Sequence, residues 1–130
     1  MITGLYVGVL AIMMALLVVN IVRKRFKNRV GLGDGGVDEL QQAIRIHGNF
    51  TEMVPMILII MVLFEVLKFS PFLIHVFGVV LILSRVLHFM GVSKTPYSSK
   101  GRAGGTMLAL LLLVIGGLLL ILHFITGIIF

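Results

Sequence analysis

Long apolar segments alternate with short polar ones along this chain of 130 residues. Apolar residues dominate residues 2–22, 38–68, 71–92 and 104–130. Because an α-helix rises about 1.5 Å per residue, each segment is long enough to cross a hydrocarbon core of about 30 Å. The pattern predicts an all-α fold, a bundle of four transmembrane helices that forms a single domain over residues 1–130.

The second segment departs from a simple apolar span. Its strongly apolar part, Met53–Leu67, is shorter than the roughly 20 residues that a span needs. We therefore expect its helix to begin earlier, near Val37 or Asp38. This start places part of the polar stretch DELQQAIRIHGNFTE at membrane depth, where it must be shielded by protein.

Composition supports the membrane assignment, because 59% of the residues are hydrophobic, only 12% are charged, and the mean hydropathy is +1.17. The chain has no cysteine, which excludes disulfides and thiol catalysis by its own side chains. The net charge of +6 comes mainly from two connecting segments rather than from a nucleic-acid-binding surface. By the positive-inside rule these two segments are cytoplasmic, so both chain termini are expected outside.

The segment GLGDGG, with glycines at positions 31, 33 and 36, has the spacing of a dinucleotide-binding loop. Such a loop works only between a strand and a helix of a parallel sheet, and here it follows RKRFKNR at the end of an apolar span. We interpret it as a flexible hinge that lets the basic end of the first span fold back over a membrane site. Asp34 or Asp38 is expected to cap the next helix.

Polar side chains gather at one depth of the predicted bundle. Arg45, Asn49 and Glu52 are spaced i, i+4, i+7 and share one helical face. The order of the spans brings this buried stripe to the inner leaflet together with Arg85, His88 and Arg102, and with Arg23 at the end of the first span. Glu52 can neutralise one arginine, so positive charge remains in excess. This excess predicts a pocket for a small anion.

Two other interpretations use the same residues. Buried polar groups also hold helices or protomers together, and arginines near span ends also reach up to lipid headgroups. A small drug exporter carries an acidic residue in the middle of its first span, and residues 2–22 contain none. No set of histidines and carboxylates has the spacing of a metal site.

The stretch ELQQAIRIHGNFTEMVP resembles the MAPEG family, the membrane-associated proteins in eicosanoid and glutathione metabolism. The shared pattern is Arg45, Asn49, Glu52 and Pro55. His47, and RVLHFMG in the third span, are similar to the prostaglandin E synthase branch. The segments GDGG and IRIHGN are most similar to the short bacterial inner-membrane members.

The resemblance implies a homotrimer that binds glutathione between protomers, towards the cytoplasmic side of a bacterial inner membrane. It implies a transferase or peroxidase that uses glutathione as co-substrate against lipophilic electrophiles or lipid hydroperoxides, with no nucleic acid involved. Arg102 would stabilise the thiolate, and Arg23, or alternatively Arg25, would bind carboxylates. The remaining implied contacts to glutathione are Arg45, Asn49, Glu52, Arg85 and His88.

The chain also differs from the eukaryotic synthases. Met53 and Val92 stand where those enzymes have tyrosines, and Tyr97 lies in the following connection without matching either position. An alternative function is therefore a non-catalytic family member that binds a lipid or another anionic metabolite.

Overall fold

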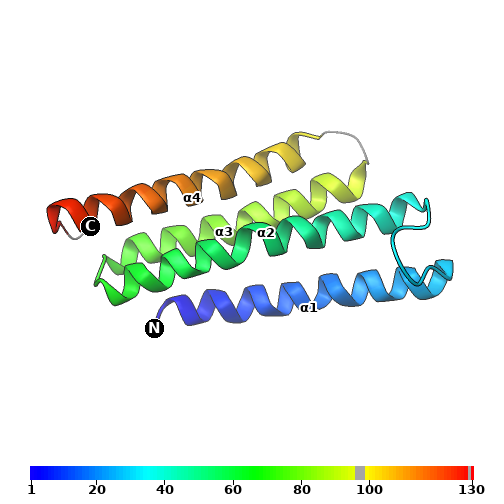
Figure 1. The fold of residues 1–130 in the computed structure, drawn as a ribbon, viewed down its shortest axis with the longest axis horizontal. Helices are drawn as coiled ribbons and strands as arrows, with labels where there is room; N and C mark the ends of the chain where they lie inside the picture. The colour runs from blue at the N-terminus through cyan, green and yellow to red at the C-terminus, as the bar shows by residue number, and fades with distance from the viewer. Residues whose placement is uncertain (96–98, 129) are drawn as a thin grey trace.

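The computed structural model describes residues 1–95, 99–128 and 130 (Figure 1). These residues form four helices and no strand, and each helix is long and apolar enough to cross a membrane. The helices are α1 (Thr3–Asn28), α2 (Asp38–Val66), α3 (Pro71–Lys94) and α4 (Lys100–Thr126). The predicted all-α bundle of four apolar helices is confirmed, and the glycine-rich segment lies between two helices rather than after a strand.

The pair α2–α3 forms the centre of the bundle, with α1 and α4 on opposite sides of it (Figure 1). Over the described residues α1 packs on α2 and α3, α4 packs on α3 and α2, and α1 and α4 do not touch. The α1–α2 connection and the adjoining ends of α3 and α4 lie at the same end of the bundle. We call this the basic end, since it carries Arg23, Lys24, Arg25, Lys27, Arg29, Lys94, Lys100 and Arg102.

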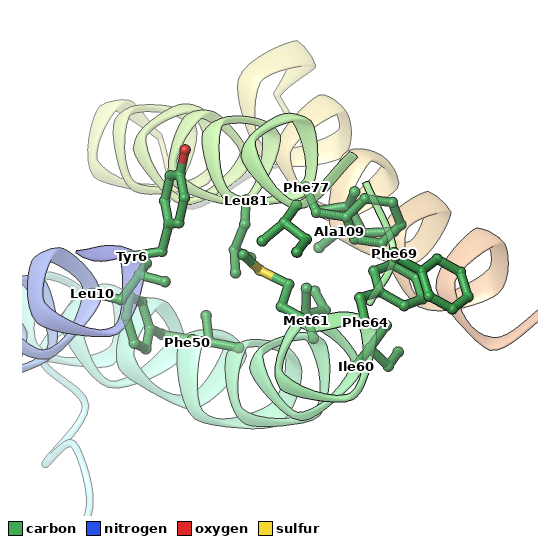
Figure 2. Close-up of a cluster of buried hydrophobic side chains, with 14 residues drawn as sticks. Tyr6, Leu10, Phe50, Ile60, Met61, Phe64, Phe69, Phe77, Leu81 and Ala109 are labelled. Atoms are coloured by element: carbon green, nitrogen blue, oxygen red, sulfur yellow. The ribbon is translucent and has the colours of Figure 1, made fainter. Parts of the chain in front are cut away.

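An aromatic cluster fills the opposite half of the bundle (Figure 2). Phe64 is fully buried and packs between two other rings, with centroids 4.6 Å from Phe69 and 5.0 Å from Phe77. Helix α4 approaches this core closely at Gly116, where a Cβ atom would lie 2.7 Å from Ile60 Cγ2. The half of the bundle away from the basic end is therefore apolar and tightly packed.

The α1–α2 connection differs from the expected hinge. The Glu39 carboxylate accepts hydrogen bonds from Lys24 Nζ at 3.0 Å, Lys27 Nζ at 2.9 Å and Asn28 Nδ2 at 3.1 Å. These contacts tie the end of α1 to the first turn of α2. Because α1 lies across the α2–α3 pair from α4, its basic end cannot fold over the α4 side of its own protomer.

The expected capping of α2 is also wrong. The N-cap residue is Val37, which has no side-chain capping bond, and Asp38 is already the first helical residue. Asp34 instead accepts a hydrogen bond from the Gly36 backbone N–H at 2.9 Å, within the turn. Gly33 and Gly36 have φ of 67° and 73°, a region where a glycine carries no steric cost. The glycines therefore shape a tight connection.

Candidate functional site

A polar groove of about 570 Å³ opens between α2, α3 and α4 in the half of the bundle nearest the basic end. Its charged lining groups are the guanidinium groups of Arg45 and Arg102, and no acidic side chain among the described residues lines it. The remaining lining residues are Asn49, His88, Val92, Ala103, Thr106, Met107 and Leu110. A groove with two cations and no carboxylate favours an anionic guest.

Arg85 lies beneath this groove, 3% exposed, and holds three helices together. Its Nη1 donates to Asn49 Oδ1 on α2 at 2.7 Å, its Nε to Ser84 Oγ on α3 at 3.1 Å, and its Nη2 to the Gly105 carbonyl on α4 at 3.2 Å. Its Nη1 also donates to the Asn49 backbone carbonyl at 3.4 Å, and all four acceptors are neutral. The positive charge of Arg85 is therefore hydrogen-bonded but not cancelled, and it adds to the field at the floor of the groove.

Close backbone contact between α3 and α4 sets the position of Arg102. A Cβ atom on Gly91 would collide with the backbone nitrogen of Arg102, and one on Gly105 would lie 2.5 Å from the Ser84 carbonyl oxygen. At the start of α4, Ser99 Oγ accepts from the Arg102 backbone N–H at 3.2 Å and donates to the Gly91 carbonyl at 2.9 Å. Arg102 is thus held by an interhelical cap and by glycine contacts.

Along α2 the expected buried stripe is only partly buried. Asn49 is buried, whereas Arg45 and Glu52 are exposed on the protomer surface and make no ion pair within the described chain. Both side chains reach towards Gly48, where a Cβ atom would lie 3.8 Å from Arg45 Nη1 and 4.0 Å from Glu52 Oε1. The expectation that Glu52 neutralises an arginine is therefore wrong for the isolated protomer.

The structure gathers some of the predicted residues and separates others. Arg45, Asn49, His88 and Arg102 line one groove, whereas Glu52 lies outside its lining. Arg23 is exposed on α1, on the far side of the α2–α3 pair. Tyr97 lies outside the described residues. No cluster of three or more potential metal ligands occurs in the part of the chain that the structure describes.

Sequence reasoning missed Ser99, Gly91 and Gly105. The signal for Ser99 was present, because a serine just before a helical segment is a common N-cap. For the two glycines the sequence offers no comparable signal, because their need for small size depends on which helices cross at that point. Thr106, which supplies a hydroxyl to the groove one turn beyond Arg102, was missed for the same reason.

We expect the substitution Ser99→Ala to loosen the first turn of α4. Loss of an N-cap side chain costs about 1 kcal/mol, and here the bond to the Gly91 carbonyl is lost as well. Hydrogen exchange of the Arg102 amide should accelerate, while Ser93→Ala, an exposed serine near the end of α3, should leave it unchanged. Equal exchange rates in Ser99→Ala and the parent would show that the cap does not hold Arg102.

Comparison with known proteins finds a matching family and two similar bacterial proteins. The model of the MAPEG family matches residues 3–122. The protein named "Inner membrane protein YecN" from Escherichia coli strain K12 is 36% identical over 120 residues, covering 91% of both chains. Its counterpart from Escherichia coli O6:H1 has the same identity and coverage. No solved structure matches the chain.

Proposed function

The chain belongs to the MAPEG family, and on that premise we propose that it binds glutathione in the polar groove and uses its thiolate to attack lipophilic electrophiles or to reduce lipid hydroperoxides. The observation that carries the proposal is the charge of the groove. Arg45 and Arg102 line it, no acidic side chain of the described residues does, and the buried guanidinium of Arg85 adds an uncancelled charge next to it.

Glutathione matches these groups in charge and in donor pattern. At neutral pH it carries two carboxylates and one ammonium group, so its net charge is negative. An arginine binds a carboxylate through two parallel N–H···O bonds, which suits Arg45 and Arg102. Asn49 and Thr106 offer further polar contacts along the same groove. Glu52 is the acidic side chain nearest to the groove on α2, and it suits the ammonium group.

Arg102 has the second task of activating the thiol. An ordinary thiol has a pKa near 8.5, so only about 3% is thiolate at pH 7. A guanidinium beside the sulfur lowers that pKa, and a shift of two units corresponds to about 2.7 kcal/mol. In a transferase step the thiolate forms an S–C bond while the leaving group departs with its electron pair.

In a peroxidase step the thiolate attacks one hydroperoxide oxygen, and the O–O bond breaks. The released alkoxide takes up a proton, and the glutathione sulfenic acid condenses with a second glutathione to give the disulfide and water. Two thiols are oxidised for each hydroperoxide reduced. Neither step requires a cysteine of the protein, and the sequence has none.

We further propose that the site is completed between protomers of a homotrimer. Arg23 and Glu52 do not line the groove of their own protomer, and α1 lies on the opposite side of α2–α3 from α4. A neighbouring copy packed against the open side of the groove brings its own α1, with Arg23, to the bound ligand. A bacterial inner membrane with the basic end in the cytoplasm is the proposed setting, in line with the name of the Escherichia coli relatives.

A non-catalytic role has one specific observation in its favour. Val92 lines the groove at the position where the eukaryotic synthases carry a tyrosine, so the groove has an apolar wall there instead of a hydroxyl donor. A chain of this kind would hold an anionic metabolite or lipid without activating it. Turnover of chlorodinitrobenzene or cumene hydroperoxide that disappears in Arg102→Ala would decide for catalysis.

Isothermal titration of glutathione into the purified protein tests the binding site. We expect Arg45→Ala and Arg102→Ala each to weaken binding by roughly tenfold, equivalent to about 1.4 kcal/mol. Lys68→Ala provides the control, because Lys68 is an exposed cation in the α2–α3 connection, away from the basic end. Absence of glutathione binding, or affinities that Arg45→Ala and Arg102→Ala leave unchanged, would refute the proposal.

A further inference from the structure

A second hollow lies on the other side of the bundle, between α1, α2 and α3. A mainly apolar cavity of about 180 Å³ has two polar residues, Arg85 and His88, in its wall, and its other lining residues are Met13, Leu16, Leu17, Ile46, Phe50 and Phe89. The cavity and α4 lie on opposite sides of the α2–α3 pair. No α4 residue lines the cavity, whereas several line the polar groove. Helix α1 touches α3 less extensively than α2, which leaves this space between them.

A polar compartment of about 230 Å³ adjoins the apolar cavity towards the basic end. The two share Ile46 and Phe89 as lining residues and therefore adjoin each other, and we call them together the α1–α3 cleft. Asn20, Gln42 and Ser93 line the polar compartment and make no side-chain hydrogen bond within the described chain. Together the two compartments fall in the ~300–1,000 Å³ range of small-molecule sites.

The charge around the polar compartment is positive, although its lining holds only the Lys24–Glu39 ion pair and Lys27 lies outside that lining. Lys24 and Glu39 both line it, and the Glu39 carboxylate is shared between Lys24 Nζ at 3.0 Å and Lys27 Nζ at 2.9 Å. One carboxylate therefore faces two ammonium groups. The excess charge lies at the end of the bundle where the apolar spans finish, which is the depth of lipid headgroups.

His88 forms part of the wall of the apolar cavity and also lines the polar groove. It is only 4% exposed and has no hydrogen-bond partner among the described residues. Every fully enclosed side-chain nitrogen or oxygen described has a partner, so the His88 nitrogens must open onto one of these two hollows. The His88 ring is therefore available to hydrogen-bond a ligand in either hollow.

From these observations we infer that the α1–α3 cleft binds a single-chain anionic amphiphile. Its acyl chain lies in the apolar cavity, along Leu17 and Phe50. Its headgroup lies among Asn20, Gln42 and Lys24. Most of the cavity wall is apolar, and at membrane depth the available apolar guest is a hydrocarbon chain. The inference does not depend on glutathione binding.

Photolabelling with a diazirine-bearing palmitate in phosphatidylcholine nanodiscs tests the inference. We expect mass spectrometry to find the label concentrated on residues 13–17 of α1 and around Phe89. Excess palmitate and excess lysophosphatidate should both compete, and monopalmitoylglycerol, which has the same chain without a charge, should not. Competition by only one of the two anions would identify a carboxylate or a phosphate as the preferred headgroup.

Two variants separate occupation of the cleft from general contact with lipid. Leu17→Trp fills the cavity and should lower labelling by roughly tenfold. Leu118→Trp, at an exposed apolar position on α4, should leave it unchanged. Leu17→Ala keeps the cavity open and should retain the label, which guards against misfolding of the tryptophan variant.

Label spread evenly over the exposed faces of α1 and α4 would overturn the inference, as would labelling insensitive to Leu17→Trp. Equal competition by monopalmitoylglycerol would contradict the inferred preference for an anionic headgroup. Protection of residues 13–17 by contact with a second copy, detected as a protein–protein cross-link, would also overturn it. Titration of glutathione into the same variants keeps the two proposals apart, because Leu17→Trp should leave glutathione affinity intact.

Discussion

Gly105→Ala is expected to lower the free energy of unfolding by about 1–3 kcal/mol, the usual cost of an overpacked contact. A Cβ atom at this position would lie 2.5 Å from the Ser84 carbonyl oxygen and 2.6 Å from the His88 backbone nitrogen. Both obstacles are backbone atoms of α3, so no side-chain rotation relieves the clash. Helix α4 must move away from α3, which also strains the bond from Arg85 Nη2 to the Gly105 carbonyl.

The matched control is the adjacent residue. A Cβ atom at Gly104 meets nothing within 4 Å, so Gly104→Ala should be neutral or should stabilise α4 by up to about 1 kcal/mol through helix propensity. Unfolding by sodium dodecyl sulfate in mixed micelles, followed by circular dichroism, measures both variants. If Gly105→Ala were as stable as Gly104→Ala, the close approach of α3 and α4 at the groove would be wrong.

The separation of α4 from α3 in Gly105→Ala should also affect ligand binding. Arg102 and Thr106 line the groove from α4, and His88 and Val92 line it from α3. Separation of these helices would widen the groove, so we expect Gly105→Ala to weaken glutathione binding as well, and Gly104→Ala to leave it intact.

Much of this arrangement was predictable from the sequence. Apolar length and charge distribution gave four helices, and helical periodicity put Arg45 and Asn49 on neighbouring turns of one helix. The order of the spans then implied that Arg85 and Asn49 lie at the same depth, and their side chains are 2.7 Å apart. These predictions depend only on local periodicity and on the alternating direction of successive spans.

Other features depend on which helices touch, and the sequence does not encode that locally. Arg23 was expected at the same end of the bundle as Arg102, and the sequence does not indicate that α1 and α4 lie on opposite sides of α2–α3. The count of charged residues also did not show which of them are hydrogen-bonded within the protein. Arg85 is bound by four neutral acceptors, so its charge adds to the positive potential of the groove while its hydrogen bonds are made within the protein.

The substitution Arg85→Met is expected to destabilise the bundle by about 1–3 kcal/mol, because it leaves Asn49 Oδ1 buried without a donor and removes the interhelical bond to the Gly105 carbonyl. Asn49→Leu should also destabilise it, because the buried guanidinium then loses its closest acceptor. The double variant removes both partners and should recover part of the loss, with a coupling of about 1–2 kcal/mol between the two sites.

This double-mutant cycle separates structural from ligand-binding roles. The control is Arg23→Met with Asn20→Leu, two polar residues of α1 that make no hydrogen bond to each other, and their effects should add. If Arg85 acts only by holding α2, α3 and α4, glutathione affinity should follow stability and recover in the double variant. An affinity that stays low while stability recovers would show that Arg85 or Asn49 binds glutathione directly. Additive losses at Arg85 and Asn49 would contradict the hydrogen-bonded arrangement beneath the groove.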